Sequence, residues 1–385
     1  MSARLLLSCG EASGDLYAGA LTRELRALDP GLTVTGLGGP QFAAAGGELI
    51  DDYRDLAVTG LTEAIAKIPR SLSALRRLVK AARTHRPDAL IAIDFPDFNF
   101  RLARAVKRLG IPVVYYIGPQ LWAWRPGRLA TMREIADRVL VIFPFEASIY
   151  RDGGVAAEFV GHPLIELAAP SAPRTRFLSA RGLSPSAPTV AILPGSRTNE
   201  VSRILPTLVA ASADIRTAVP GVQFVIARAP HLDDRLFDLP TKGPYPSSPP
   251  FFTIVESDTD TVLASADVAL TASGTATVQS ALHDTPMVIV YRVSPLTYRL
   301  GRRLLTIDTI GMVNLIAGEK IVPELVQDAF TPAAVAREAI SLLTDRARAA
   351  HVRAGLARVR ERLGGPGASR RAAEAILRVV GSNRG

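Results

Sequence analysis

The chain has 385 residues, of which 48% are hydrophobic and 21% are charged, and its formal net charge is +9. These values are typical of a globular protein and exclude a disordered or fibrous chain. Because single hydrophobic cores rarely grow beyond roughly 250 residues, this length predicts two domains. The single cysteine, Cys9, excludes an intrachain disulfide and favours a reducing compartment, so we expect a cytoplasmic protein.

The positive charge points to an anionic partner: a nucleotide, a phosphorylated substrate, a lipid headgroup or a nucleic acid. The sequence has no zinc-finger spacing, no aromatic RNA-binding motif and no dense basic run, which disfavours nucleic acid. The apolar run near the start covers only residues 5–7, shorter than the ~7 to 15 residues of an export signal. No window reaches the ~18 apolar residues of a membrane-spanning helix. We therefore expect neither export nor a membrane span.

Short apolar runs alternate with helical stretches through the first half of the chain. Apolar runs without polar alternation are typical of parallel strands that helices cover on both faces. The first half therefore predicts an α/β domain with a doubly wound parallel sheet. The predicted strands are ARLLLSC (3–9), ALIAID (89–94), PVVYYIG (112–118) and RVLVIFP (138–144), and the helices are LYAGALTRELRAL (16–28), FRLARAVKRLG (100–110) and FEASIYRDGG (145–154).

A stretch rich in Pro, Ala and Ser at residues 163–188 indicates a domain boundary. The alternation restarts after it, which predicts a second Rossmann-like domain that faces the first across a cleft. The segment 332–380 has a helical pattern, and we expect the last helices to pack back on the first domain. The predicted domains are residues 1–168, 169–345 and 346–385. The predicted strands of the second domain lie in the segments TVAILPGSR (189–197), VQFVIARAP (222–230), FFTIVES (251–257), ADVALTASG (266–274) and PMVIVYR (286–292).

The loop SCGEASGD (8–15) is the first candidate site, because ligands of open α/β sheets bind beyond the carboxyl ends of the strands. It lacks the lysine and the spacing of a phosphate loop, and the carboxylates of Glu11 and Asp15 disfavour an anion. Two interpretations remain. Either Ser13 and Asp15 cap the next helix while Gly14 allows a tight turn, or the loop accepts hydrogen bonds from sugar hydroxyls.

The loop ALIAIDFPDFN (89–99) is the second candidate. Asp94 ends an apolar strand, where partial burial raises the pKa of a carboxyl group and suits it to accept a proton. The alternative is a carboxylate that ties down the neighbouring loop. Asp97 or Asn99 has a structural role as the N-cap of a helix that begins near Phe100.

Two loops of the second domain, LPGSR and ASGTAT, combine the features of anion sites. Each places small residues between a strand and a helix, so that loop N–H groups point to one place at a positive helix end. Two such loops in one domain favour a nucleotide diphosphate, although ordinary Ser/Thr caps with a glycine turn explain either loop alone. The residues are Gly195, Ser196 and Arg197 in the first loop and Ser273, Gly274 and Thr275 in the second.

Other segments carry weaker signals. Trp122 and Trp124 lie in a Pro/Gly-rich loop and form either a wall near a ligand or a plug at a sheet edge. His162 is interpreted as structural. The sequence shows no metal-ligand spacing, no G-x-S-x-G elbow and no Cys-His pair, so metal and covalent mechanisms are disfavoured.

The segment 61–83 is a basic amphipathic pattern with no acid after Glu63. Such a segment either lies on an anionic bilayer or forms a solvated helix face, and both interpretations stay open. The membrane-facing candidates are Lys67, Arg70, Arg76, Arg77 and Lys80.

Motifs in order along nearly the whole chain resemble those of one family. They are GEASGD (10–15), GLGGPQF (36–42), DFPDFN (94–99), PQLWAWRPGR (119–128), FPFE (143–146), VGHPL (160–164), LPGSR (193–197), SGTAT (273–277) and PMVIVYR (286–292). This set resembles the lipid-A-disaccharide synthase family. The resemblance implies an inverting hexosyltransferase with the two-domain GT-B fold. Its reaction would join UDP-2,3-diacylglucosamine to 2,3-diacylglucosamine 1-phosphate, giving lipid A disaccharide 1-phosphate and UDP.

The resemblance also implies catalysis without a metal or another cofactor, and a protein attached peripherally to the inner face of the cytoplasmic membrane. It leaves the oligomeric state open. Two alternatives remain: another GT-B enzyme, such as a UDP-N-acetylglucosamine transferase or epimerase, or a non-catalytic nucleotide- or lipid-binding protein.

Residue by residue, the resemblance implies that Asp94 is the base for the acceptor hydroxyl. Arg197, the loop around Ser196 and the amides from Ser273 to Ala276 would hold UDP, and Asn314 would lie near the donor. The chain departs from the family at Gln279, where a glutamate suited to the ribose is usual, and at Val313, where proline is usual. Glu11, Ser13 and Asp15 would organise the acceptor sugar or shape their own loop.

Overall fold

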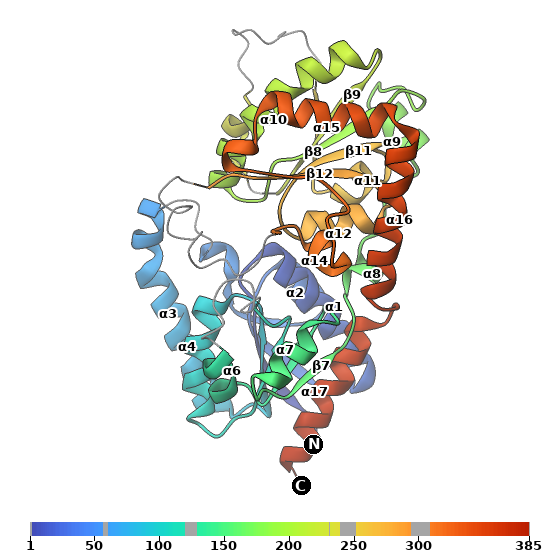
Figure 1. Cartoon of the computed structure of the whole chain (residues 1–385). Helices are drawn as coiled ribbons and strands as arrows, with labels where there is room; N and C mark the ends of the chain where they lie inside the picture. Colours follow the sequence, from blue (N-terminus) through green and yellow to red (C-terminus); the bar gives the residue numbers. More distant parts are fainter. Residues whose placement is uncertain are drawn as a thin grey trace. The chain divides into compact units, whose positions relative to one another are not determined.

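The computed structural model of the chain describes residues 2–56, 61–119, 129–230, 232–238, 252–293 and 309–384, with the backbone alone at 61–68 (Figure 1). The chain forms two compact units. The first comprises Met1–Glu166 and Leu363–Gly385, and the second comprises Leu167–Arg362. The chain therefore leaves the first unit near residue 166 and returns to it near 363, where the sequence predicts boundaries at 168 and 345.

A parallel sheet forms the centre of the first unit. Its strands, within the described residues, are β1 (Arg4–Ser8), β2 (Thr33–Gly38), β3 (Glu48–Asp52), β4 (Ala89–Ile93), β5 (Val113–Tyr116), β6 (Arg138–Val141) and β7 (Ala157–Phe159). Their order in the sheet is β3-β2-β1-β4-β5-β6-β7. From β1, the strands β2 and β3 extend the sheet on one side, and β4 and the later strands extend it on the other. The order in which strands are added therefore reverses between β1 and β4, where Leu7 pairs with Ile91. This doubly wound order places a switch point, the usual position of a ligand, beyond the ends of β1 and β4.

Helices flank this sheet. They are α1 (Ala12–Leu28), α2 (Pro40–Ala44), α3 (Leu61–His85), α4 (Pro96–Lys107), α6 (Leu129–Ile135), α7 (Glu146–Asp152) and α17 (Ala368–Arg384), with a 3₁₀ turn at Tyr53–Asp55 and the short α8 (Leu164–Leu167) where the chain leaves the unit. The last helix, α17, packs against α1. The carboxylate of Glu166 holds its start, accepting from Gly367 N (2.6 Å) and Ser369 N (3.0 Å). The end of the chain thus belongs to the first unit.

The second unit repeats this plan. Its described strands are β8 (Thr189–Leu193), β9 (Gln223–Arg228), β10 (Phe252–Glu256), β11 (Val268–Ala272), β12 (Met287–Tyr291) and β13 (Glu324–Val326). All pairs are parallel, in the order β10-β9-β8-β11-β12-β13. The switch point lies between β8 and β11, which pair through Leu193 and Thr271. Its loops are the two that the sequence marks as anion sites.

The helices of the second unit include the helix α16, which the sequence assigned to the third predicted segment. They are α9 (Arg174–Ser179), α10 (Thr198–Ala218), α11 (Thr259–Ala264), α12 (Thr275–Leu282), α14 (Met312–Ala317), α15 (Pro332–Thr344) and α16 (Arg346–Arg362), with 3₁₀ turns at Asp234–Phe237 and Gln327–Ala329. The helix α16 packs against α12, α14 and α15. It therefore belongs to the core of this unit.

The central strands of both sheets are buried over their whole length. Every residue of β4, β8 and β11 is buried, as expected for parallel strands covered on both faces. Each fully buried Leu, Ile or Val side chain stabilises its unit by about 1.5–3 kcal/mol. This packing fixes the strand ends, and so it fixes the loops that begin there. Among the described helices, none combines the length and the apolar composition that crossing a bilayer requires.

Candidate active site

The loops after β1 and β4 are joined by Asn99. Its Oδ1 accepts from Ser8 Oγ (2.6 Å), and its Nδ2 donates to Ser8 O (3.3 Å) and to Asp94 O (2.8 Å). Asn99 is fully buried, so losing these bonds would leave buried polar groups unpaired at a cost of about 1–3 kcal/mol each. The predicted helix cap at Asp97 or Asn99 is wrong, because α4 begins earlier, at Pro96, and Phe95 takes the N-cap position.

Asp94 sits in a strained turn. Its φ is +42° and that of Phe95 is +50°, a left-handed conformation that costs non-glycine residues of order 1 kcal/mol or more. Hydrogen bonds hold the turn, since Asp94 O also accepts from Tyr115 Oη (2.6 Å). The Asp94 side chain is half-buried. Consecutive strained residues held in this way are typical of functional sites.

The carboxylate of Asp94 acts on two buried tyrosines. Burial raises the pKa of Tyr115 and of Tyr150 above their ordinary value. The negative charge of Asp94 raises the pKa of Tyr115 further, and the charges of Glu146 and then Asp94 raise the pKa of Tyr150. Tyr150 donates its hydroxyl to Pro119 O (2.6 Å). Both phenols therefore stay protonated at neutral pH and keep donating to the backbone at the carboxyl end of the sheet.

The loop 8–15 contacts the Asp94 turn through the ring of Phe95. A Cβ atom placed on Gly10 would lie 2.2 Å from this ring, so only glycine fits there. Gly14 lies within α1, where its Cβ would lie 3.2 Å from Cys9 Cβ. The tight turn expected at Gly14 is wrong, since this glycine is helical and lets α1 approach the strand.

Asp15 is the most tightly held acid of this loop. It is 2% exposed, and its carboxylate accepts from Gly39 N (2.8 Å), Gln41 N (2.9 Å) and Phe42 N (3.0 Å). It therefore caps the start of α2 and not its own helix, so its part in the expected capping of α1 is wrong. Asp15 was expected either to organise the acceptor sugar or to shape its own loop. These bonds to backbone N–H groups are those of a residue that shapes the loop. Glu11 is exposed at the N-cap position of α1, and Ser13 is half-buried in its first turn, so the capping role expected of Ser13 is also wrong.

In the second unit, the loop after β8 holds a negative group of its own chain. Glu200 accepts from Ser196 N (3.2 Å) and pairs with Arg197 Nη1 (3.3 Å). Gly195 has φ +122°, and a Cβ there would lie 2.7 Å from the Glu200 side chain. The predicted convergence of a loop N–H and a guanidinium on one point is therefore present, with a carboxylate at that point. Sequence reasoning missed Glu200, although its position three residues after Arg197 places it in the first helical turn.

The loop after β11 opens α12 at Gly274, whose φ is +144°. Among the residues that the structure describes, no atom lies within 4 Å of a Cβ built on Gly274, so they leave space beside this turn. Thr275 is exposed and Ala276 is half-buried in the first turn, where Thr277 N donates to Gly274 O (3.0 Å). The N–H groups of Thr275 and Ala276 lie at the very start of the helix, where an α-helix offers its N–H groups no acceptor of its own. Ser273 Oγ donates to Ile310 O (3.0 Å), which ties the loop to the chain before α14.

Asn314 is buried and fully used within the protein. It donates to Val322 O (3.0 Å) and Glu324 Oε1 (2.7 Å), and it accepts from Ile321 N (2.9 Å) and Val322 N (3.1 Å). Glu324, which sequence reasoning missed, also accepts from Gly311 N (3.0 Å). Asn314 therefore positions the segment before and after α14 through its amide.

Gln279 lies one turn into α12 and is half-buried. Its Nε2 donates to Asp260 Oδ1 (3.1 Å), and His283 Nε2 lies 2.8 Å from the same oxygen. The residue at the position where the family usually has glutamate thus belongs to a polar cluster of three side chains, from α11, from α12 and from the residue that follows α12. Asp260 carries no sequence signal, because its partners lie about twenty residues away.

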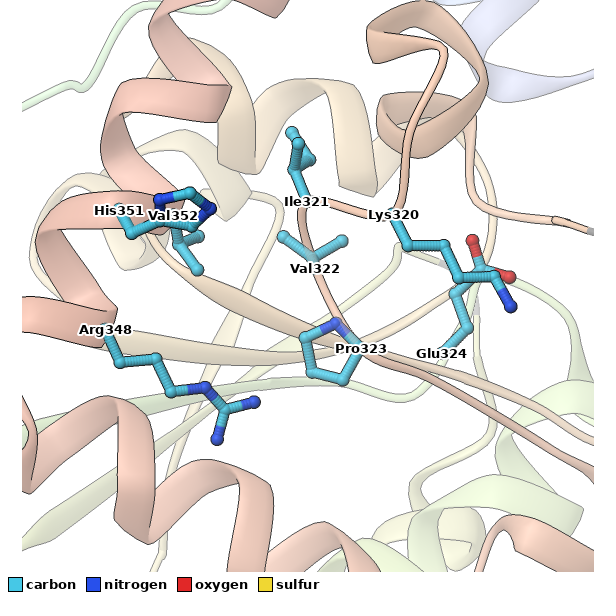
Figure 2. A pocket seen from close by; sticks show the side chains of 8 residues that line it. All are labelled: Lys320, Ile321, Val322, Pro323, Glu324, Arg348, His351 and Val352. Carbon is cyan, nitrogen blue, oxygen red and sulfur yellow. The ribbon is translucent and has the colours of Figure 1, made fainter.

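A hollow of about 340 Å³ lies elsewhere on the second unit, between residues 320–324 and α16 (Figure 2). Lys320 and His351 line it, together with Arg348, which pairs with Glu338 at 2.5 Å. None of the residues that the sequence singles out as candidates lines this hollow.

The remaining candidates are placed as follows. Trp122 and Trp124 lie outside the described residues, as does the side chain of Lys67. On α3, Arg70, Arg76 and Lys80 are exposed. Arg77 is also exposed and binds Asp51 through two hydrogen bonds of 2.6 and 2.7 Å.

His162 is buried, as its structural interpretation requires. Its Nδ1 accepts from Leu164 N (3.2 Å), and burial lowers its pKa to about 3, so the ring is neutral. Within the described residues, no group of three or more His, Cys, Asp or Glu side chains is arranged to hold a metal ion.

Solved structures share this fold over the whole chain. A UDP-GlcNAc 2-epimerase from Neisseria meningitidis, bound to UDP-GlcNAc, matches with a TM-score of 0.71 at 11% identity, covering 97% of this chain and 100% of that one. The glycosyltransferase of kitacinnamycin matches with a TM-score of 0.64 at 18% identity, covering 99% and 100%. At these identities the likeness establishes the fold alone. The fold is that of the GT-B glycosyltransferases, two α/β units each built on a parallel sheet.

Sequence comparison identifies the family. The family model "Lipid-A-disaccharide synthetase" matches residues 5–379. A lipid-A-disaccharide synthase of Koribacter versatilis is 45% identical over 383 residues, covering 98% of this chain and 97% of that protein. One of Myxococcus xanthus is 42% identical over 381 residues, covering 99% and 98%. The chain belongs to the lipid-A-disaccharide synthetase family, a family of transferases.

Proposed function

We propose that the chain joins UDP-2,3-diacylglucosamine to 2,3-diacylglucosamine 1-phosphate, giving lipid A disaccharide 1-phosphate and UDP. The observation that carries this proposal is the family match over residues 5–379, together with relatives at 41–45% identity that bear the synthase name. Membership makes the chain a glycosyltransferase of lipid A biosynthesis. The reaction needs a base for the acceptor hydroxyl and positive groups for the leaving diphosphate.

In this proposal Asp94 is the base. It takes the proton of the acceptor 6-hydroxyl as that oxygen attacks the donor's anomeric carbon, while the bond from this carbon to the UDP oxygen breaks. The attack inverts the anomeric configuration and forms no covalent intermediate with the protein. The support is the fixed turn at the end of β4, where two hydrogen bonds to the backbone carbonyl of Asp94 hold the main chain that carries this carboxylate. A positioned general base is worth about 10²–10⁴ in rate.

The second unit holds UDP in this proposal. Arg197 and the N–H of Ser196 bind one part of the diphosphate, and the first turn of α12 from Thr275 binds the other. The support is the contact with Glu200, since donors that already hold a carboxylate can hold a phosphate oxygen. Glu200 releases Ser196 N–H when the diphosphate enters.

The acceptor sugar lies beside the loop 8–15 in this proposal. The exposed Glu11 and the half-buried Ser13 face the hydroxyls, while Gly14 and Asp15 keep the loop in shape through the contacts described above. Trp122 and Trp124 remain candidates for an apolar wall beside the acyl chains.

The first unit also attaches the protein peripherally to the inner face of the cytoplasmic membrane, where both acylated substrates reside. The support is α3, which exposes Arg70, Arg76 and Lys80 together with the side chain of Leu72. Each basic residue near an anionic surface contributes about 1 kcal/mol. Arg77, whose charge is neutralised by Asp51, contributes less.

Vesicle flotation tests this attachment. The double variant Arg76→Glu/Lys80→Glu should lose binding to anionic vesicles of phosphatidylglycerol and phosphatidylethanolamine. The control Arg101→Glu/Arg108→Glu makes the same charge change at exposed positions on and next to α4 of the same unit. Equal loss of vesicle binding in both variants would indicate that the exposed side of α3 is an ordinary solvated helix face.

Mass spectrometry of the products tests the reaction. The purified chain is incubated with UDP-2,3-diacylglucosamine and 2,3-diacylglucosamine 1-phosphate, and we expect a disaccharide 1-phosphate and stoichiometric UDP. An isomer of the UDP-sugar with unchanged mass would indicate an epimerase, and unchanged substrates would indicate a binding protein. Either result would contradict the proposal.

A further inference from the structure

Asp260, Gln279 and His283 form a cluster that the proposed reaction does not yet use. Both side-chain contacts reach one oxygen of the Asp260 carboxylate, Oδ1: Gln279 Nε2 at 3.1 Å and His283 Nε2 at 2.8 Å. Within the described part of the chain, no hydrogen bond or ion pair reaches Asp260 Oδ2. The Asp260 side chain is 22% exposed, whereas His283 is 7% exposed. The cluster therefore leaves one carboxylate oxygen, Oδ2, to accept a hydrogen bond from a ligand that enters from solvent.

We propose that Asp260 is a ribose-binding residue of the nucleotide site, with Oδ2 accepting from a ribose hydroxyl and Gln279 fixing its orientation. This inference rests on the proposed function, because it assumes that UDP binds to the second unit. It adds to that function the residue that recognises the sugar part of the nucleotide.

The position of the cluster supports a ribose. Gln279 lies four residues after Thr275 in α12, so the two share a face of the helix, separated by about one turn of 5.4 Å. The start of α12 is the proposed diphosphate site, and in a nucleoside diphosphate the ribose follows directly after the inner phosphate. A group one turn into the helix is therefore at the level where the ribose hydroxyls arrive.

The chemistry of the pair fits two adjacent hydroxyls. Because a carboxylate only accepts, the atom of Gln279 that faces Asp260 is its NH₂ group, and its Oε1 remains as a second acceptor. Two vicinal hydroxyls thus meet two acceptors, one of them charged. The charged one forms the stronger bond, roughly twice that of a neutral acceptor.

The same geometry explains why residue 279 is an amide in this chain. A glutamate at that position would bring a second carboxylate to about 3 Å from Asp260, and two like charges at that separation cannot both stay ionised without a large cost. The negative charge thus sits on α11 and the amide on α12. The number of charges in the cluster is kept at one carboxylate.

Nucleotide affinities test the proposal by calorimetric titration with UDP, 2′-deoxy-UDP and 3′-deoxy-UDP. The wild type should bind UDP about tenfold or more tightly than the analogue that lacks the bonded hydroxyl. The variant Asp260→Asn keeps an oxygen for Gln279 and His283 but replaces Oδ2 by an NH₂ group. It should bind UDP about tenfold less tightly and that deoxy analogue as the wild type does.

Two further variants separate recognition from structure. Asp258→Asn, two residues earlier, removes a carboxylate that accepts from Ser171 Oγ (2.8 Å), and it should leave discrimination unchanged. The exchange Asp260→Asn/Gln279→Glu restores one carboxylate and one amide, and it should recover most of the discrimination. Equal loss for UDP and both analogues in Asp260→Asn, or no loss at all, would overturn the inference. If the wild type did not bind UDP, the proposed function itself would fall.

Discussion

The switch-point loops of the two units differ in how their polar groups are satisfied. In the first unit, Asn99 and Asp15 are buried and bonded to the backbone of neighbouring loops. In the second, Arg197 and Ser196 hold a carboxylate of their own chain, and both are exposed. In the first unit, the buried bonds of Asn99 fix the turn that carries Asp94. The second keeps donors ordered around the carboxylate of Glu200, which the diphosphate would replace in the proposed function.

This difference matches the division of work in a glycosyl transfer. A general base acts only from a set position, and loss of alignment costs rate. A diphosphate site must bind UDP-sugar and then release UDP, so its donors cannot be locked by buried bonds. One variant in each arrangement should therefore change different steps.

The largest effect is expected from Asp94→Asn. The amide cannot take the acceptor's proton, so kcat should fall about 10²–10⁴-fold while the affinity for UDP stays unchanged. The measurement is UDP release from the two substrates. The matched control is Asp97→Asn, an exposed carboxylate in the first turn of α4, and an equal fall in both variants would remove Asp94 from the reaction.

The buried His162 should make the stability of the first unit depend on pH. Its pKa is about 3 in the folded unit against about 6.5 in the unfolded chain, so between these values only the unfolded chain binds the proton. The stability of the first unit should therefore fall as the pH decreases below about 6.5, by about 2 kcal/mol at pH 5 from this group. His162→Gln keeps an acceptor for Leu164 N and should lose less stability on acidification. Hydrogen exchange of first-unit amides at pH 7 and pH 5 measures this, and identical acid sensitivity in both proteins would refute it.

Arg197→Gln tests the second unit. Loss of a charge-assisted bond to the diphosphate costs about 1.5–3 kcal/mol when shielded, and since Arg197 is exposed we expect the lower end, about tenfold weaker UDP binding. Titration with UDP and with uridine separates the effect, because uridine has no phosphate. A loss of uridine affinity as large as that of UDP would place Arg197 away from the diphosphate.

Glu200→Gln should act in the opposite direction. The neutral amide leaves Ser196 N–H and Arg197 more readily than the carboxylate, so UDP binding should tighten about three- to tenfold. The same titration measures it. Weaker UDP binding in this variant would show that Glu200 orients the loop for the nucleotide, and the contrast between the two units would then fail.

The fold was predictable because buried parallel strands appear in the sequence as uninterrupted runs of apolar residues. The runs at 89–94 and 189–197 correspond to β4 and β8, and their following loops carry the motifs of the family. The fold class needed only this alternation and the rule that ligands bind beyond strand ends.

The roles of individual polar residues were less predictable, because their partners are distant in sequence. Asn99 meets Ser8 across 91 residues, and Asp15 caps α2 through residues 24 to 27 positions away. Local spacing assigned both to helix caps, because capping is the frequent local use of Asp and Asn. Glu200 differs, since its partner Arg197 is three residues away and the first-turn acid was a readable signal.

The anomeric configuration of the product tests the central claim most directly, namely that the transfer is a single displacement in which the protein supplies a base and no nucleophile. The disaccharide formed by the wild-type chain is isolated, and the proton coupling constant at the new glycosidic carbon is measured by NMR. We predict the configuration opposite to that of the donor. Retention of the donor's configuration would require two successive displacements and would contradict the account.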